Sequence, residues 1–186
     1  MYTFFLCTGL VALAEIGDKT QLLALVLAAR FGRPWPIVAG IAVATLLNHA
    51  LAGAAGHWLL ARLGPDWLRI LLALGFMAMA AWMLVPDRLD AAEAERPPPR
   101  LGVFGVTAVA FFLAEMGDKT QVATVMLAAR FQDWTPVVLG TTAGMLLANA
   151  PVVWLGERIT RRVPLAVVRK TSAVLFAALG VAALLG

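Results

Sequence analysis

The chain has 186 residues, of which 61% are hydrophobic and only 14% charged, and its mean hydropathy is +0.85. These values exclude a water-soluble globular domain and indicate a small polytopic membrane protein. The 15 Lys and Arg outnumber the 11 Asp and Glu. Because most of the Lys and Arg residues lie at the ends of apolar segments rather than along one face, we expect no nucleic-acid partner. The single cysteine, Cys7, excludes a disulfide framework and a Cys-based metal cluster.

Six stretches with few or no charges follow one another along the chain, and each is long enough to cross a hydrocarbon core of ~30 Å as a helix. They cover residues 1–29, 34–61, 67–85, 101–129, 134–156 and 165–186. The first and fourth are longer than a span needs, so they must tilt, bend or break, and a break costs least at Gly17 and Gly117. The sequence predicts an all-α integral membrane protein with six transmembrane helices.

The two halves of the chain carry the same motif at an offset of 100 residues. Thirteen of the nineteen positions in 13–31 are identical in 113–131. Each half has three spans, an odd number, so we expect two inverted-topology repeats with a site at their interface near the bilayer midplane. The prediction is one membrane domain with a first three-helix repeat at 1–86, a cytoplasmic linker at 87–100 and a second repeat at 101–186.

Lys and Arg are distributed unequally between alternate connections. Ten lie on one side of the predicted membrane, namely Arg30, Arg33, Arg88, Arg96, Arg100, Arg158, Arg161, Arg162, Arg169 and Lys170. Three lie on the other side, namely Arg62, Arg69 and Arg130. The positive-inside rule makes the first side cytoplasmic, so both termini are expected on the non-cytoplasmic side. The Arg-rich, Lys-poor and Ala-rich composition favours a bacterial inner membrane.

Six charges fall inside the two repeated spans, where each costs ~2.5 to 3.5 kcal/mol on insertion scales and therefore indicates a function. They are Glu15, Asp18, Lys19, Glu115, Asp118 and Lys119. A spacing of three residues places each carboxylate pair on one face of a helix. Gln21 and Gln121 extend the polar stretch, and Thr20 and Thr120 can bond back to the backbone.

If the two motifs meet, four carboxylates and two ammonium groups leave a formal charge of minus two, which one divalent cation would neutralise. Oxygen ligands suit Ca²⁺, Mn²⁺ and Mg²⁺, whereas Zn²⁺ and copper would be expected to recruit Cys or His. Crowded carboxylates also repel one another, so protons can occupy the site when the metal is absent. Competition between protons and metal for the same oxygens is the simplest physical basis for antiport. The lysines could tether the carboxylates in the empty state.

Other polar residues fall within the second and fifth spans. Asn48 and Asn149 could supply neutral oxygen ligands, or they could form interhelical hydrogen bonds that serve packing. His49 could hydrogen-bond, transfer protons or bind the metal. Met116, inside the second motif, could offer a thioether that favours Mn²⁺ over Ca²⁺, although packing is the more usual role of a methionine.

The duplicated E-x-G-D-K-T motif, at 15–20 and 115–120, resembles the signature of a family of small cation/proton exchangers that includes bacterial manganese exporters and Golgi manganese and calcium transporters. The resemblance covers nearly the whole chain. It implies a secondary transporter, not an enzyme, that exports Mn²⁺ or Ca²⁺ from the cytosol in exchange for protons and needs no resident cofactor. It also implies that the motif carboxylates bind the ion.

Three other functions are weighed against this one. Gly17-Asp18 and Gly117-Asp118 match part of an intramembrane aspartyl protease motif, but each Asp is followed by Lys. An exporter of a small organic cation or amino acid is a second alternative, although the motif contains no aromatic residue. A structural membrane subunit leaves the cost of six buried charges unexplained. The sequence does not determine the oligomeric state.

Overall fold

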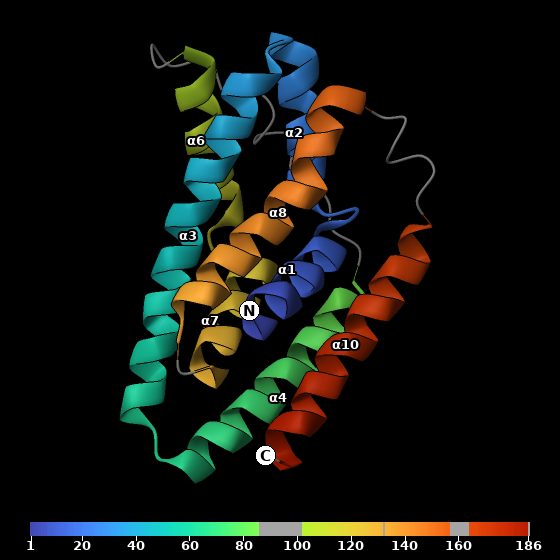
Figure 1. Cartoon of the computed structure of the whole chain (residues 1–186). Helices are drawn as coiled ribbons and strands as arrows, with labels where there is room; N and C mark the ends of the chain where they lie inside the picture. Colours follow the sequence, from blue (N-terminus) through green and yellow to red (C-terminus); the bar gives the residue numbers. More distant parts are fainter. Residues whose placement is uncertain (86–101, 132, 157–163, 186) are drawn as a thin grey trace.

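The computed structural model describes residues 1–85, 102–131, 133–156 and 164–185. Every regular element in these residues is an α-helix (Figure 1). The helices are α1 (Tyr2–Glu15), α2 (Lys19–Phe31), α3 (Pro34–Arg62), α4 (Pro65–Met83), α6 (Gly102–Glu115), α7 (Lys119–Arg130), α8 (Thr135–Leu155) and α10 (Leu165–Leu185). The prediction of an all-α protein is therefore confirmed for the described part of the chain.

Four of these helices are long and apolar enough to cross a membrane, namely α3, α4, α8 and α10. The helices α1 and α6 are apolar but shorter. Each is followed, after a break of three residues, by the helix that completes the corresponding predicted span, α2 or α7. The four long helices indicate a multi-pass membrane protein, whereas the six-span arrangement stays a prediction.

Local sequence explains where several helices begin and end. The helices α3, α4 and α8 each have a proline in the first two positions, where the missing N–H would have no helical partner in any case. The helix α2 ends at Phe31, and the N–H of its capping residue Gly32 donates a hydrogen bond of 2.9 Å to the Ala28 carbonyl oxygen. These signals mark where α3, α4 and α8 begin and where α2 ends.

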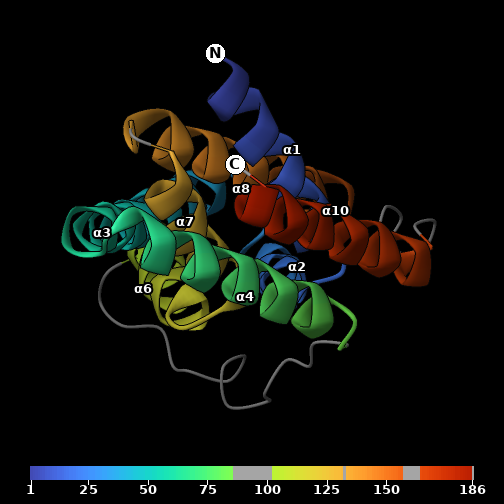
Figure 2. The same ribbon diagram turned by 90° about the horizontal axis from the view of Figure 1, so that it is seen from below.

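Helices from opposite halves of the chain pack together. The helix α1 lies against α8, α3 lies against α6, and α4 runs beside α10 (Figures 1 and 2). Small residues allow the first two pairs to approach closely: a Cβ atom at Gly140 would lie 2.6 Å from the Phe4 carbonyl oxygen, and one at Gly40 would lie 2.9 Å from that of Phe104. The contact of Gly40 with Phe104 therefore has a counterpart, at an offset of 100 residues, in the contact of Gly140 with Phe4.

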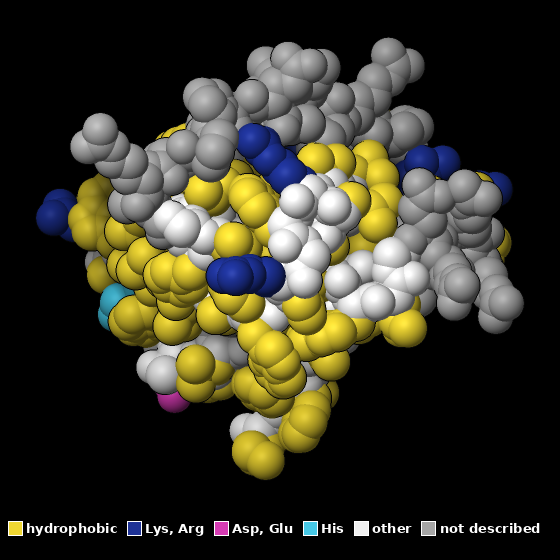
Figure 3. Space-filling view, turned by 90° about the horizontal axis from the view of Figure 1, so that it is seen from above, with side chains coloured by type: hydrophobic (Ala, Val, Ile, Leu, Met, Phe, Trp, Pro, Cys, Tyr) yellow, Lys and Arg dark blue, Asp and Glu magenta, His cyan; other side chains and the backbone are white. Residues whose placement is uncertain are grey.

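The polar side chains of the motifs lie in the interior, whereas much of the exterior is apolar. Large hydrophobic residues are exposed along several helices, for example Leu51, Leu74, Leu147 and Val174. Figure 3 shows such a mostly hydrophobic surface, with a few Lys and Arg side chains, at the end of the molecule where α2 ends and α3 begins. The motif glutamates, by contrast, are completely buried. This distribution fits a protein whose exterior faces lipid.

Some predictions fall on residues whose structure is not described. The linker at 87–100 is one of them, together with six of the ten basic residues on the predicted cytoplasmic side. These six are Arg88, Arg96, Arg100, Arg158, Arg161 and Arg162. The linker and the orientation therefore stay predictions.

Candidate metal centre

Each motif lies at a break between two helices rather than within one helix. The helix α1 ends at Glu15, Gly17 adopts a left-handed conformation (φ 83°), and Asp18 caps the start of α2. In the second half, α6 ends at Glu115 and α7 begins after Asp118. The prediction that each carboxylate pair lies on one face of a single helix is wrong, because the left-handed glycine interrupts the helix between the two acids.

A glutamine side chain holds each break in place. The Gln21 Oε1 atom accepts a hydrogen bond of 3.0 Å from the Gly17 N–H, and Gln121 accepts one of 2.6 Å from the Gly117 N–H. The amide groups then reach the opposite half: Gln21 Nε2 donates to the Ala148 carbonyl oxygen (3.0 Å) and Gln121 Nε2 to Asn48 Oδ1 (3.2 Å). Each glutamine thus fixes a broken helix against the other half of the chain.

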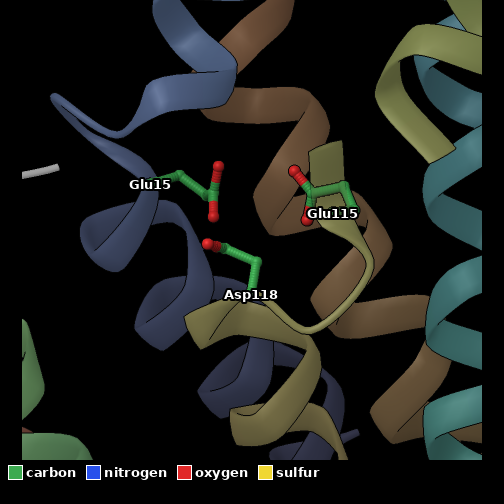
Figure 4. Close-up of side chains that lie close together, drawn as sticks. All are labelled: Glu15, Glu115 and Asp118. Atoms are coloured by element: carbon green, nitrogen blue, oxygen red, sulfur yellow. The ribbon is translucent and has the colours of Figure 1, made fainter. Parts of the chain in front are cut away.

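The breaks bring three carboxylates together. Glu15, Glu115 and Asp118 each offer an oxygen atom, and these atoms lie within 4.8 Å of one another. The three side chains come from the end of α1, the end of α6 and the start of α7, and they point toward a common centre (Figure 4). All three are buried. We call these three residues the carboxylate cluster.

The motif threonines donate to the glutamates. Thr20 Oγ1 lies 2.7 Å from Glu15 Oε2, and Thr120 Oγ1 lies 3.1 Å from Glu115 Oε2. The hydroxyls thus bond to the glutamates instead of the backbone, since the break in the helix turns each of them toward its glutamate. Within the described residues, the other oxygen of each glutamate, Oε1, is buried without a hydrogen-bond partner.

The two halves are not equivalent at the remaining charges. Lys19 forms an ion pair with Asp118 at 3.2 Å. Lys119 is buried and donates to the Val85 carbonyl oxygen at the end of α4, at 3.1 Å. Asp18 lies outside the carboxylate cluster and accepts hydrogen bonds from the backbone N–H and the hydroxyl of Thr20, at 3.4 and 3.5 Å. The expected group of four carboxylates is thus a group of three with Asp18 beside it.

The two asparagines have different surroundings. Asn48 accepts from Gln121 and donates to the Phe112 carbonyl oxygen at 3.0 Å, so in this structure it connects helices. Asn149 Nδ2 lies 3.5 Å from Glu15 Oε2, beside the carboxylate cluster. Its Oδ1 atom is buried with no partner in the described part of the chain. His49 is fully buried, and neither ring nitrogen has a hydrogen-bond partner among the described residues.

One neighbour of the site is absent from the sequence prediction. Met145 Sδ lies 2.9 Å from Asn149 Nδ2, and the side chain is fully buried. Met116, the methionine considered from the sequence, is instead 54% exposed and faces away from the interior. The signal that could have indicated Met145 is its position one helical turn before Asn149.

The chemistry of the site is that of a binding site for a hard cation. Three carboxylates supply oxygen ligands, and with the Lys19 ammonium their formal charge is minus two. Buried carboxylate oxygens without partners are costly, and a bound cation would remove that cost. The arrangement is therefore suited to one divalent ion.

Comparison with known proteins identifies the family. A family model described as "Divalent cation/proton antiporter GDT1" matches residues 3–91 and 103–186. The chain belongs to this family. It is a divalent cation/proton antiporter, which confirms the resemblance noted from the duplicated motif and the prediction of a transporter rather than an enzyme. The protease alternative is thereby excluded.

Two known proteins are similar in sequence to this GDT1-family antiporter. A protein of Vibrio cholerae serotype O1 named "Putative manganese exporter" is 50% identical over 169 residues, which cover 89% of this chain and 82% of that protein. A GDT1-like protein of Synechocystis sp. is 29% identical over 159 residues, which cover 75% of this chain and 74% of that protein. No solved structure matches the antiporter significantly.

Proposed function

We propose that this antiporter exports Mn²⁺ from the cytosol in exchange for protons, and that the ion binds at the carboxylate cluster. The observation that carries the proposal is the convergence of Glu15, Glu115 and Asp118, whose oxygens lie within 4.8 Å of one another in a buried position. The free Oε1 atoms of both glutamates are suitable first ligands, because neither has a hydrogen-bond partner in the described residues.

We propose Mn²⁺ rather than Ca²⁺ as the transported ion. Both ions accept carboxylate and amide oxygens, so the cluster itself suits either. The name of the Vibrio cholerae relative, a manganese exporter, supports Mn²⁺ for a chain that is 50% identical to it. Ca²⁺ is the alternative cargo.

The remaining predicted ligands fall into two groups. Asn149 is the better neutral ligand, because it already touches Glu15 and its oxygen has no partner among the described residues. Asp18 and Asn48 would have to exchange their present hydrogen bonds for the ion. They are proposed as ligands of a state in which the halves have moved, and His49 as a neutral group beside the path of the ion or of the protons.

Proton coupling follows from the electrostatics of the empty site. Three carboxylates so close together repel one another, and protons or a cation relieve that repulsion. Since the same oxygens accept either, binding of Mn²⁺ releases protons and binding of protons releases Mn²⁺. The ion pair of Lys19 with Asp118 offsets part of the repulsion when no metal is bound.

We also propose a topology of six spans. The pairs α1–α2 and α6–α7 would each form one discontinuous span, and α3, α4, α8 and α10 would form the others. Two inverted repeats at 1–86 and 101–186, joined by a cytoplasmic linker at 87–100, would place the carboxylate cluster at the midplane. Both termini would lie outside the cytoplasm of a bacterial inner membrane. The recurring contacts of Gly40 and Gly140 support the repeat.

An exporter of a small organic cation or amino acid is the weaker proposal. Carboxylate oxygens within 4.8 Å of one another suit a bare ion better than a molecule with carbon atoms of its own. No observation on the described residues favours the organic substrate.

Transport in proteoliposomes with an imposed pH gradient tests the proposed function. We expect Mn²⁺ uptake coupled to proton movement, stronger than uptake of Ca²⁺, Mg²⁺ or an organic cation. Glu15→Gln and Asp118→Asn should each lower transport by about 100-fold or more, because even groups that only support metal ligands cost 10 to 100-fold when lost.

The matched control is Asp66→Asn, which removes an exposed carboxylate in the first turn of α4. This variant should transport normally. Unchanged transport in both Glu15→Gln and Asp118→Asn would reject the carboxylate cluster as the ion site. Uptake of the organic cation in place of Mn²⁺ would reject the proposed cargo.

A further inference from the structure

A thioether lies at the edge of the carboxylate cluster. Met145 and Asn149 are one turn apart on α8, and the Met145 Sδ atom lies 2.9 Å from Asn149 Nδ2. The same nitrogen lies 3.5 Å from Glu15 Oε2. A single amide group therefore separates the sulfur from a carboxylate of the proposed ion site. Met145 is fully buried, so no solvent or lipid competes for the sulfur.

The amide of Asn149 has the wrong polarity for a bound cation. Its N–H₂ group faces Glu15 and donates to the sulfur and to the backbone carbonyl oxygen of Met145 (3.1 Å), while its Oδ1 atom is buried without a partner in the described residues. A cation on Glu15 would repel the N–H₂ group and attract the oxygen. The terminal torsion of asparagine is broad and roughly two-fold, so half a turn exchanges the two atoms. That turn also breaks the hydrogen bonds to the sulfur and to the Met145 carbonyl oxygen, so the amide no longer occupies the sulfur lone pairs.

A thioether distinguishes between the ions that the carboxylates accept. Sulfur of methionine is a soft ligand, which Ca²⁺ and Mg²⁺ avoid because they take oxygen ligands almost exclusively. Mn²⁺ shares their preference for oxygen ligands, but as a first-row transition metal it gains more from a single soft ligand than they do. We propose that Met145 is a specificity-determining residue whose sulfur favours Mn²⁺ over Ca²⁺ and Mg²⁺ at the site. This inference rests on the proposed function and refines it.

The first half of the chain has no sulfur at the position equivalent to Met145. At an offset of 100 residues, Thr45 corresponds to Met145 and His49 corresponds to Asn149. Both are fully buried, and the Thr45 hydroxyl has no partner in the described residues. The equivalent position in the first half therefore carries a small hydroxyl side chain in place of the methionine. The sulfur of Met145 distinguishes one copy of the repeat from the other.

Metal titration of the solubilised antiporter tests the inference. Met145→Leu keeps the volume and removes the sulfur. We expect the affinity for Mn²⁺ to fall about tenfold with the affinity for Ca²⁺ unchanged, a size typical of losing one supporting group at a metal site. The matched control is Met79→Leu, at a buried methionine in the core between α4 and α10, which should leave both affinities unchanged.

Three results would overturn the inference. They are unchanged affinities in Met145→Leu, an equal loss for both ions, and an X-ray absorption spectrum of the Mn²⁺-loaded wild type that contains only oxygen and nitrogen neighbours. A sulfur neighbour in that spectrum, lost in Met145→Leu, would support it even if the variant is less stable. Glu15→Gln separates the two proposals: if it retains Mn²⁺ binding, the proposed site fails, whatever Met145 does.

Discussion

At the scale of single residues, the threonines of the two motifs are as much part of the site as the acids. Each donates its hydroxyl to the glutamate five positions earlier, and each is buried. A hydrogen bond to a charged group is worth about 1.5 to 3 kcal/mol. The threonines therefore orient the glutamates and favour the ionised form that binds metal.

Replacing these hydroxyls should weaken metal binding. Thr20→Val and Thr120→Val keep the shape and remove the donor, so we expect the affinity for Mn²⁺ to fall about tenfold in each, equivalent to ~1.4 kcal/mol. Isothermal titration of the solubilised protein would measure it. Thr107→Val is the control, because Thr107 is buried but donates to the Val103 carbonyl oxygen. An equal effect in the control would show that only stability had changed.

The sequence predicted the charged residues of the site but not all of their partners. Glu15, Glu115 and Asp118 could be identified because charges inside apolar spans are costly. The directions of Thr20, Thr120 and Asp18 could not, since they depend on which residue interrupts the helix. Whether Asn48 or Asn149 lies beside the carboxylates depends on the packing of distant helices, which no local pattern reveals.

At the scale of the elements, the broken helices are the feature that makes the site. Gly17 and Gly117 have φ values of 83° and 77°, which L-residues with a side chain rarely adopt. The sequence predicted that the two long spans would tilt, bend or break, and that a break would cost least at these glycines. Both helices do break there, and the breaks leave the ends of α1 and α6 facing a common centre.

Alanine at either glycine should destabilise the protein. Gly117→Ala adds a Cβ atom with no neighbour within 4 Å, so only the backbone is strained, by about 1 to 2 kcal/mol. Gly17→Ala adds the same strain and a contact of 2.5 Å with Leu165 Cδ2, so it should cost more. Thermal unfolding in detergent would rank the variants.

A helical glycine provides the control for this pair. Gly9 lies within α1, and a Cβ atom there would meet nothing within 4 Å. Gly9→Ala should therefore raise stability by about 0.5 to 1 kcal/mol. If Gly117→Ala were as stable as Gly9→Ala, the left-handed conformation at the break would be wrong.

At the scale of the whole molecule, the distribution of basic residues predicts which side faces the cytoplasm. A single cysteine introduced by Glu93→Cys should react with a membrane-impermeant thiol reagent only from the cytoplasmic side. Gly64→Cys, in the exposed turn between α3 and α4, should react from the outside. Both belong in a Cys7→Ala background, although Cys7 is itself buried.

Labelling of intact cells and of inverted vesicles would measure this difference. Reaction of both positions from the same side would contradict the odd number of spans between them. If position 93 reacted from outside and position 64 from inside, the six spans would stand and only the predicted orientation would be wrong. The orientation alone rests on the positive-inside rule.

The pairing of helices across the two halves has a consequence for the origin of the protein. Glu15 meets Asn149, Lys19 meets Asp118, and Gln121 meets Asn48, so neither half holds a complete set of partners. An ancestor with one copy of the motif could have assembled such a site only from two separate chains. With both copies in one chain, each position can change without its counterpart, as the difference between Thr45 and Met145 illustrates.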